Sequence, residues 1–561
     1  MALLNYQPFA LYLVIFLILL YQTFLLKLEV FNSFFFYPNV CFMKVSLLKI
    51  ALLFFLVPFT VLAQKEKVDL SVIQKIKDEE SRHSHVAEIA HYLTDVSGSR
   101  LTNSPGYKRA SNWAVQTLQQ WGLQAVLEPW GEFGKGWNLE HSYVAMKAPY
   151  YQPLIAYPKA WSASTNGLIS APVYLLDRID SASIAAAGDK LKGKIVLTRS
   201  ADTVLKSAFV AFAERYSDSA LRNLHDADML PRTMIDMYVD MLRAQYKAEQ
   251  YLKEKGALAL LLMNPTGRDG TLFTDGTPSY DKNYPPTLPQ AVVSTEDYLK
   301  IQRLLNDGTG VTIDLDIATT WNNDDVTGYN VIAEIPGTDP GLKAQVVMLG
   351  GHLDSWHSGT GATDNAAGCV VMMEAVRLIK VLGLQPKRTI RIALWGGEEQ
   401  GLYGSIGYVK KHFGDPANMN LLPEQKNISA YFNLDNGSGK IRGIYLQNNE
   451  SVRSIFSAWL QPYADLDATT ITAANTGSTD HLSFDAVGIP GFQFIQDPLE
   501  YETRTHHSNM DTYDHLQIDD LKQAAAIVAG FIYNAAERKD LLPRKKLPKA
   551  ERFIFDTDFP I

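Results

Sequence analysis

The feature that most constrains the fold is a regular alternation of apolar strands and helices that begins near Asn330. Short runs rich in Val, Ile, Leu and Met alternate with longer stretches that have a helical pattern of apolar residues. The spacing predicts strands and helices in turn: strands over 346–349, 389–394 and 428–434, and helices over 366–382, 401–412 and 522–538. Alternation of this kind is typical of a mainly parallel sheet covered by helices on both faces. We therefore expect a doubly wound α/β fold.

Acidic and imidazole side chains follow three of the predicted strands. His352 and Asp354 come after the first strand. Glu398 and Glu399 come after the second strand, and Asp435 directly follows the third. Open α/β sheets bind ligands in the crevice outside the carboxyl ends of their strands. These side chains are therefore expected to meet at one edge of the sheet.

A further carboxylate, Asp364, lies in a glycine-rich loop just before the predicted helix over 366–382. Carboxylates crowded at one edge repel one another and raise one another's pKa values, and divalent cations remove that penalty. Histidine with carboxylates is a typical zinc environment. A site for two zinc ions can be assembled from His352, Asp364, Glu399, Asp435 and one later histidine. Glu398 is then left as a general base, and Asp354 is placed to accept the second N–H of His352.

Other readings of these residues find less support. An adjacent acidic pair is usually solvated helix surface, but Glu398 and Glu399 follow an apolar strand through Trp395-Gly396-Gly397. The chain has neither the Gly-x-Ser-x-Gly motif of serine hydrolases nor the His-Glu-x-x-His helix of single-zinc endopeptidases. Cys369 lies in an apolar run, which favours a buried and inert thiol over a nucleophile.

The length of 561 residues predicts two or three domains. Residues 64–150, with helical periodicity over 71–121, are expected to be the N-terminal part of the catalytic domain. Short β runs and Pro/Gly-rich turns follow over 151–320, which we interpret as an inserted domain. The catalytic domain is expected over 321–541, followed by a basic and then aromatic tail, 542–561. The formal net charge of −8 provides no basic surface for nucleic acid.

Two apolar segments precede the first predicted helix. Residues 9–26 are about long enough to cross a bilayer. Residues 43–63 begin with Met43 and Lys44 and end in Val61-Leu62-Ala63, as a secretory signal peptide does. We expect translation to start at Met43, which makes 1–42 an upstream extension and the protein secreted or periplasmic. The alternative is a membrane protein anchored by 9–26.

Several segments together resemble the di-zinc exopeptidase family, which includes secreted bacterial leucine aminopeptidases and plasma glutamate carboxypeptidase. The resemblance extends over roughly residues 71–538, and its motifs occur in the family's order. The matching segments are Gly351-His352-Leu353-Asp354-Ser355, Thr363-Asp364-Asn365-Ala366-Ala367-Gly368, Trp395-Gly396-Gly397-Glu398-Glu399, Asn433-Leu434-Asp435, Ser478-Thr479-Asp480-His481 and His507-Ser508-Asn509-Met510-Asp511-Thr512.

The resemblance implies a role for each matching position. His352 and Asp435 would hold one zinc, Glu399 and His507 the other, and Asp364 would bridge the two. Glu398 would be the general base for a hydroxide shared by the two metals, and Asp354 would orient His352. The segment 151–320 resembles a protease-associated domain, a β-rich module beside the cleft. The implied activity is hydrolysis of a terminal peptide bond of peptides or dipeptides.

Some assignments stay open at this stage. Many family members have tyrosine where this chain has His506, so either Tyr501 or His506 would stabilise the oxyanion. Arg504 would pair with a substrate carboxylate or with a neighbouring acid, and Asp480 and His481 would support the substrate site. The terminus that is cleaved is undecided between aminopeptidase and carboxypeptidase, and a homodimer is compatible with the family. Two alternatives are an amidohydrolase acting on a non-peptide amide or an N-terminal glutamine, and a non-catalytic receptor.

Overall fold

The alternation after residue 330 builds one eight-stranded sheet in the order β1-β10-β12-β11-β15-β18-β16-β17. The central strands β12, β11, β15 and β18 pair in parallel, and the antiparallel pairs lie toward the edges. The strands are β1 (Gln124–Glu132), β10 (Thr327–Ile335), β11 (Val346–His352), β12 (Thr389–Trp395), β15 (Ile428–Asn433), β16 (Ile441–Tyr445), β17 (Thr470–Thr472) and β18 (Gly491–Gln496). The predicted α/β fold with a mainly parallel sheet is confirmed.

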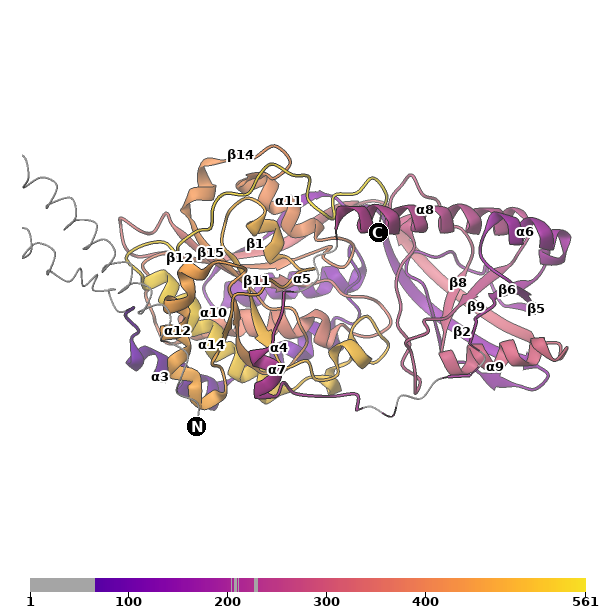
Figure 1. Ribbon diagram of the computed structural model, residues 1–561, viewed down its shortest axis with the longest axis horizontal. Helices are drawn as coiled ribbons and strands as arrows, with labels where there is room; N and C mark the ends of the chain where they lie inside the picture. Colours follow the sequence, from indigo (N-terminus) through magenta and orange to yellow (C-terminus); the bar gives the residue numbers. More distant parts are fainter. Residues whose placement is uncertain (1–65, 203, 206–208, 210, 227–230, 561) are drawn as a thin grey trace, which may run out of the picture. The chain divides into compact units, whose positions relative to one another are not determined.

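The computed structural model describes residues 66–202, 204–205, 209, 211–226 and 231–560. Helices cover both faces of the eight-stranded sheet, as the alternation predicts (Figure 1). One face carries α3 (Leu70–His83), α4 (Val86–His91), α5 (Pro105–Gln120), α10 (Ala367–Val381), α12 (Arg453–Leu460) and α14 (Ile518–Glu537). The other face carries α11 (Tyr403–His412) and the short α13 (His481–Asp485).

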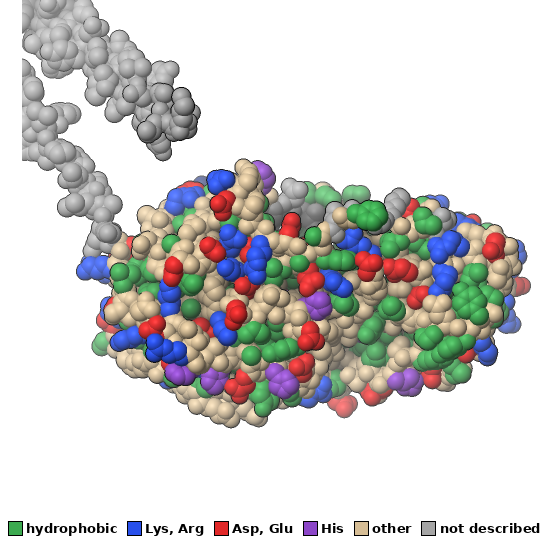
Figure 2. All heavy atoms as spheres, turned by 90° about the horizontal axis from the view of Figure 1, so that it is seen from below, with side chains coloured by type: hydrophobic (Ala, Val, Ile, Leu, Met, Phe, Trp, Pro, Cys, Tyr) green, Lys and Arg blue, Asp and Glu red, His purple; other side chains and the backbone are tan. Residues whose placement is uncertain are grey.

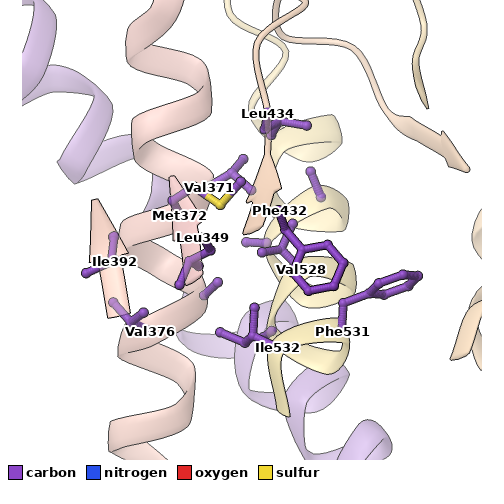
Figure 3. Packing of buried hydrophobic residues seen from close by; sticks show 14 of the residues in the cluster. Leu349, Val371, Met372, Val376, Ile392, Phe432, Leu434, Val528, Phe531 and Ile532 are labelled. Atoms are coloured by element: carbon purple, nitrogen blue, oxygen red, sulfur yellow. The ribbon is translucent and has the colours of Figure 1, made fainter. Parts of the chain in front are cut away.

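The core is divided between the two faces because successive strand side chains point in opposite directions. In β11, Val347 and Leu349 pack toward α10 and α14, whereas Val346 and Met348 pack toward α11. Figure 3 shows the larger core, where strand side chains meet two helices. Its labelled residues are Leu349, Ile392, Phe432 and Leu434 from the strands and the segments that follow them, Val371, Met372 and Val376 from α10, and Val528, Phe531 and Ile532 from α14. This packing holds β11, β12 and β15 in fixed register, so their carboxyl ends form one edge.

A second eight-stranded sheet is ordered β3-β2-β9-β5-β6-β7-β8-β4. Its strands are β2 (Gly136–Ala148), β3 (Gln152–Pro153), β4 (Ala156–Pro158), β5 (Ile169–Leu176), β6 (Ile195–Thr198), β7 (Ala259–Leu262), β8 (Gln290–Val293) and β9 (Thr312–Asn322). Accompanying helices are α6 (Ser181–Ala187), α8 (Arg232–Glu254) and α9 (Thr295–Asn306), with α7 (Asp218–Arg222) and the hairpin β13–β14 (Gly414–Asp415 and Asn420–Leu421) elsewhere. The sheet begins before the expected boundary at residue 151, because β2 pairs with β9 along its length, from Gly136 opposite Asn322 to Ala148 opposite Thr312.

The predicted signal peptide over 43–63 and the alternative anchor over 9–26 lie outside the described residues. Within the described part of the chain, no helix combines the length and hydrophobicity that a membrane span requires. On the face drawn in Figure 2, blue and red side chains are interspersed.

A partly buried ion pair between helix α11 and the edge strand β1 predicts a pH dependence of stability. His412 Nε2 of α11 lies 2.6 Å from Oε1 of Glu128 in β1. Hydrogen bonds to Glu128 and Glu424 raise the pKa of His412 to about 9. Burial opposes ionisation of Glu128, but His412 and Lys411 outweigh it and lower the pKa of Glu128 to about 2.

The stabilisation from His412 is complete below its unfolded pKa of about 6.5 and is lost as pH rises through about 9. The stabilisation from Glu128 is complete above about 4.5 and is lost as pH falls through about 2. We expect His412→Gln to lower the free energy of unfolding by about 1–2 kcal/mol between pH 4.5 and 6.5, after allowance for solvent screening. Denaturant titrations of both proteins at pH 5.5 and 9.5 test this prediction. If the substitution lowers the free energy of unfolding equally at the two pH values, the prediction is wrong.

Candidate metal centre

Three neighbouring strands bring ligand-type side chains to one edge. His352 is the last residue of β11, and β12 on one side and β15 on the other run parallel to it. Glu398 and Glu399 follow the end of β12, and Asp435 follows the end of β15. The expected convergence at the carboxyl ends of the strands is therefore present in the structure.

The imidazole of His352 is surrounded by carboxylates. Its Nε2 lies 3.2 Å from Asp364 Oδ1, 3.3 Å from Asp435 Oδ1 and 3.9 Å from Glu398 Oε2. Its Nδ1 lies 3.0 Å from the backbone carbonyl of Asp354, which can only accept a hydrogen bond. Nδ1 therefore donates to this carbonyl, and Nε2 is the ring nitrogen that faces the carboxylate oxygens. Burial disfavours the charged ring, but Asp435 and Glu398 outweigh it and raise the pKa of His352 well above its usual value.

Asp364 connects this group to a second one. Its Oδ2 lies 3.3 Å from His507 Nε2, and the same nitrogen lies 2.9 Å from Glu399 Oε2. His506 is more distant, with Nε2 3.7 Å from Asp364 Oδ2, and its ring is tilted against that of Tyr501 at a centroid distance of 4.8 Å. The geometry therefore favours His507 over His506 as the partner of Glu399, although both rings reach Asp364.

The turn that presents the two glutamates depends on local backbone geometry. Gly397 has a φ of +76°, a conformation that glycine adopts without a steric penalty. The carboxylate of Asp354 accepts hydrogen bonds from the backbone N–H groups of Glu398 and Glu399, each at 3.2 Å. The expected contact between the Asp354 carboxylate and the His352 ring is longer, at 3.7 Å. Asp354 thus holds His352 through its backbone carbonyl, and its carboxylate holds the glutamate turn instead.

The electrostatics of the site follow from burial of several carboxylates together. Burial raises the pKa of Glu398 well above its usual value, the charged form of His352 opposes this, and Asp435 and Asp480 add to it. Burial and the neighbouring Asp364 raise the pKa of Glu399 to about 7, against the influence of His507. Without a bound cation, simultaneous ionisation of several carboxylates in this site is therefore unfavourable.

The donor set fits metal ions. Ligand atoms within 4.8 Å of one another form three groups: His352, Asp364 and Glu399; His352, Glu398 and Asp435; and Asp364, His506 and His507. Asp364 Oδ2 and Glu399 Oε1 are buried and have no hydrogen-bond donor within the described residues. Buried carboxylate oxygens without a donor, beside histidine ring nitrogens, match the needs of divalent cations.

Two residues that support this arrangement were not assigned a role from the sequence. Asp511 accepts hydrogen bonds from the backbone N–H of Thr363 at 2.6 Å and of Asp364 at 3.1 Å, so it holds the loop that carries Asp364. The buried Arg100 donates to the carbonyls of Leu353 at 2.7 Å and Gly361 at 2.7 Å. Asp511 lies in a motif that the sequence singles out, whereas Arg100 has no local signal beyond its turn-rich loop.

The remaining candidates lie at different places. Tyr501 and His506 line the cavity that contains the ligand cluster. Arg504 does not line it; its guanidinium lies 3.8 Å from Glu500 and over the Phe212 ring at 4.7 Å. Asp480 and His481 are fully buried outside the lining, and His481 Nε2 contacts the backbone carbonyl of Thr476 at 3.1 Å. The structure thus brings Tyr501 and His506, but not Arg504, to the cavity.

Residues 330–532, which contain every one of the predicted metal ligands, match the family described as Peptidase family M28. Over this part of its length the chain is thus similar to peptidase family M28. The predicted enzyme class, a metallopeptidase, is therefore confirmed.

The similarity to M28 proteins extends beyond the matched domain. Human carboxypeptidase Q is 28% identical over 457 residues, which cover 81% of this chain and 85% of that protein. Leupeptin-inactivating enzyme 1 of Streptomyces exfoliatus is 36% identical over 187 residues, covering 33% of this chain and 39% of that protein. The crystal structure of a peptidase M28 precursor from Shewanella amazonensis SB2B has a TM-score of 0.61 at 25% identity and covers 85% of this chain and 98% of that one.

Proposed function

We propose that the chain is a secreted exopeptidase that holds two zinc ions and hydrolyses a terminal bond of short peptides. The observation that carries this proposal is the meeting of three groups of ligand atoms, all within 4.8 Å in each group, on the wall of one cavity. The cavity has a volume of about 560 Å³, in the range of sites that enclose a small ligand.

The two ions are assigned by contact. His352 and Asp435 would hold one zinc, and Glu399 and His507 the other, in agreement with the short distances within each pair. Asp364 directs one oxygen toward each histidine and would bridge the two ions. This set leaves positions open for water and substrate, as catalytic zinc sites require.

Bound zinc supplies a water of lowered pKa and polarises a carbonyl group. The chain supplies the proton transfer. Glu398 lines the cavity, lies farther from His352 than Asp364 and Asp435 do, and is held at its backbone N–H by Asp354. Glu398 accepts the proton of the attacking water and delivers it to the leaving amine, so it acts first as base and then as acid. Tyr501 and His506, on the same wall, are placed to bind the oxyanion.

We further propose that the second sheet forms a protease-associated domain beside the cleft. Its segment around Thr274 runs along the ligand loop, with the Thr274 N–H donating to the His507 carbonyl at 2.9 Å. Trp161 and Asp275 from the same region line the cavity. This domain therefore contributes to the substrate site without supplying a metal ligand.

An assay with a set of blocked and unblocked tripeptides shows which terminus of the peptide is cleaved. Zinc-loaded protein is incubated with a free tripeptide, its N-acetylated form and its C-terminal amide, and products are separated by chromatography. Similarity to carboxypeptidase Q over 85% of that protein favours a requirement for the free carboxylate. Cleavage of the amide but not of the acetylated peptide would instead assign an aminopeptidase, and cleavage of none would contradict the proposed function.

A further inference from the structure

The C-terminal tail is attached to helix α8 of the second sheet, and Figure 1 marks the C-terminus beside this helix. Arg232, at the start of α8, donates hydrogen bonds to the tail carbonyls of Phe553 at 3.0 Å, Ile554 at 3.2 Å and Asp556 at 3.2 Å. Three hydrogen bonds from one guanidinium hold the tail backbone at a defined place on the helix.

The same tail is also joined to the peptidase domain. The Glu551 N–H donates to the carbonyl of Pro416 at 2.9 Å, and Lys410 Nζ lies 3.3 Å from Asp556 Oδ2. Lys410 belongs to α11, which packs on the catalytic sheet. The tail therefore crosses from the catalytic domain to α8.

Apolar contacts fix the end of the tail. Phe559 is 2% exposed and packs in one cluster with Ile235 and Val239 of α8. Its ring centroid lies 4.7 Å from that of Tyr284, and the Arg243 guanidinium lies 5.5 Å from its centre. Burial of an aromatic ring among apolar side chains stabilises the docked position of the segment.

The tail and α8 together form an apolar wall of the cavity that contains the metal ligands. The wall consists of Tyr238, Leu242, Tyr246, Ile554, Phe555 and Phe559. Ile554 and Phe555 are only half-buried, so part of their apolar surface is directed to space that a ligand can fill. Apolar lining with a few polar groups is typical of a pocket that binds an apolar side chain.

We propose that residues 554–559 and α8 form a specificity pocket for a large apolar side chain of the peptide substrate. The inference rests on the proposed function, because it assigns a part of the substrate to the wall that the tail and α8 form in the cavity of the metal ligands. The tail is thus a substrate-binding element in addition to a connection between the two sheets.

The test uses trialanine and three tripeptides with a single leucine at each position in turn. For the unaltered protein, one of the leucine peptides should have a higher kcat/KM than trialanine. Phe555→Ala should lower that leucine-to-alanine ratio about tenfold, the usual effect of removing apolar contacts from a pocket. Phe553→Ala is the matched control, since Phe553 is a buried tail ring whose centroid lies 6.1 Å from that of Phe555 but which does not line the cavity.

Peptide binding provides a second readout that does not depend on turnover. Dissociation constants for the same four peptides are measured by calorimetry on zinc-loaded Glu398→Gln protein, with and without Phe555→Ala. A selective weakening of the preferred leucine peptide supports the pocket. If Phe555→Ala weakens the binding of all four peptides equally, or if Phe553→Ala has the same effect, the proposed pocket is wrong. If the unaltered protein cleaves no peptide, the proposed function fails, while the binding data still decide on the pocket.

Discussion

Glu398→Gln is expected to lower kcat by about 10²- to 10⁴-fold while both zinc ions stay bound, because it removes the proton acceptor but not a ligand. Glutamine has nearly the same shape and keeps the backbone N–H that Asp354 holds at 3.2 Å. The measurement is kcat on the best tripeptide, together with zinc per chain by atomic emission.

Glu502→Gln is the matched control, since Glu502 lines the same cavity but its side chain is 71% exposed and belongs to none of the ligand groups. Removal of that charge should change kcat by less than about threefold, as a screened surface charge does. Loss of zinc from the Glu398 variant would make Glu398 a ligand, and an unchanged kcat would remove it as the base.

The fold was predictable where the information is local. The period of apolar residues specifies β11, β12 and β15 and the helices between them, and a parallel sheet then places the strand ends together. The second sheet was harder to delimit, because β2 joins it through pairing with β9, about 170 residues later. Such pairing leaves no signal in either segment alone.

The site was predictable in its residue types but not in all its contacts. Asp354 was expected to hold the His352 ring with its carboxylate, but the backbone carbonyl takes that place and the carboxylate binds the glutamate turn. For Arg504 two partners were open, a substrate carboxylate or a neighbouring acid, and the structure places its guanidinium near Glu500 and over Phe212. Both outcomes depend on which atom of a residue faces the site, and spacing along the chain does not determine that.

Asp364→Asn is expected to abolish the stabilisation that zinc gives to the folded protein. Asp364 directs one oxygen to within 3.2 Å of His352 Nε2 and the other to within 3.3 Å of His507 Nε2, so its carboxylate contacts a histidine in each half of the site. Zinc present at about 1,000 times its dissociation constant stabilises the unaltered protein by about 4 kcal/mol. An amide has no charge and a single good acceptor oxygen, so it cannot bridge two cations.

The two proteins are unfolded by heat with zinc and after chelation, and zinc per chain is measured in parallel. Chelation should lower the midpoint temperature of unfolding by several degrees for the unaltered protein and leave it nearly unchanged for Asp364→Asn. Asp275→Asn is the control, because Asp275 lines the same cavity and pairs with Lys159 at 3.0 Å, outside the ligand groups. It should keep the full response to chelation. A full response in Asp364→Asn as well would show that the two ions are held independently, and the bridging assignment would then be wrong.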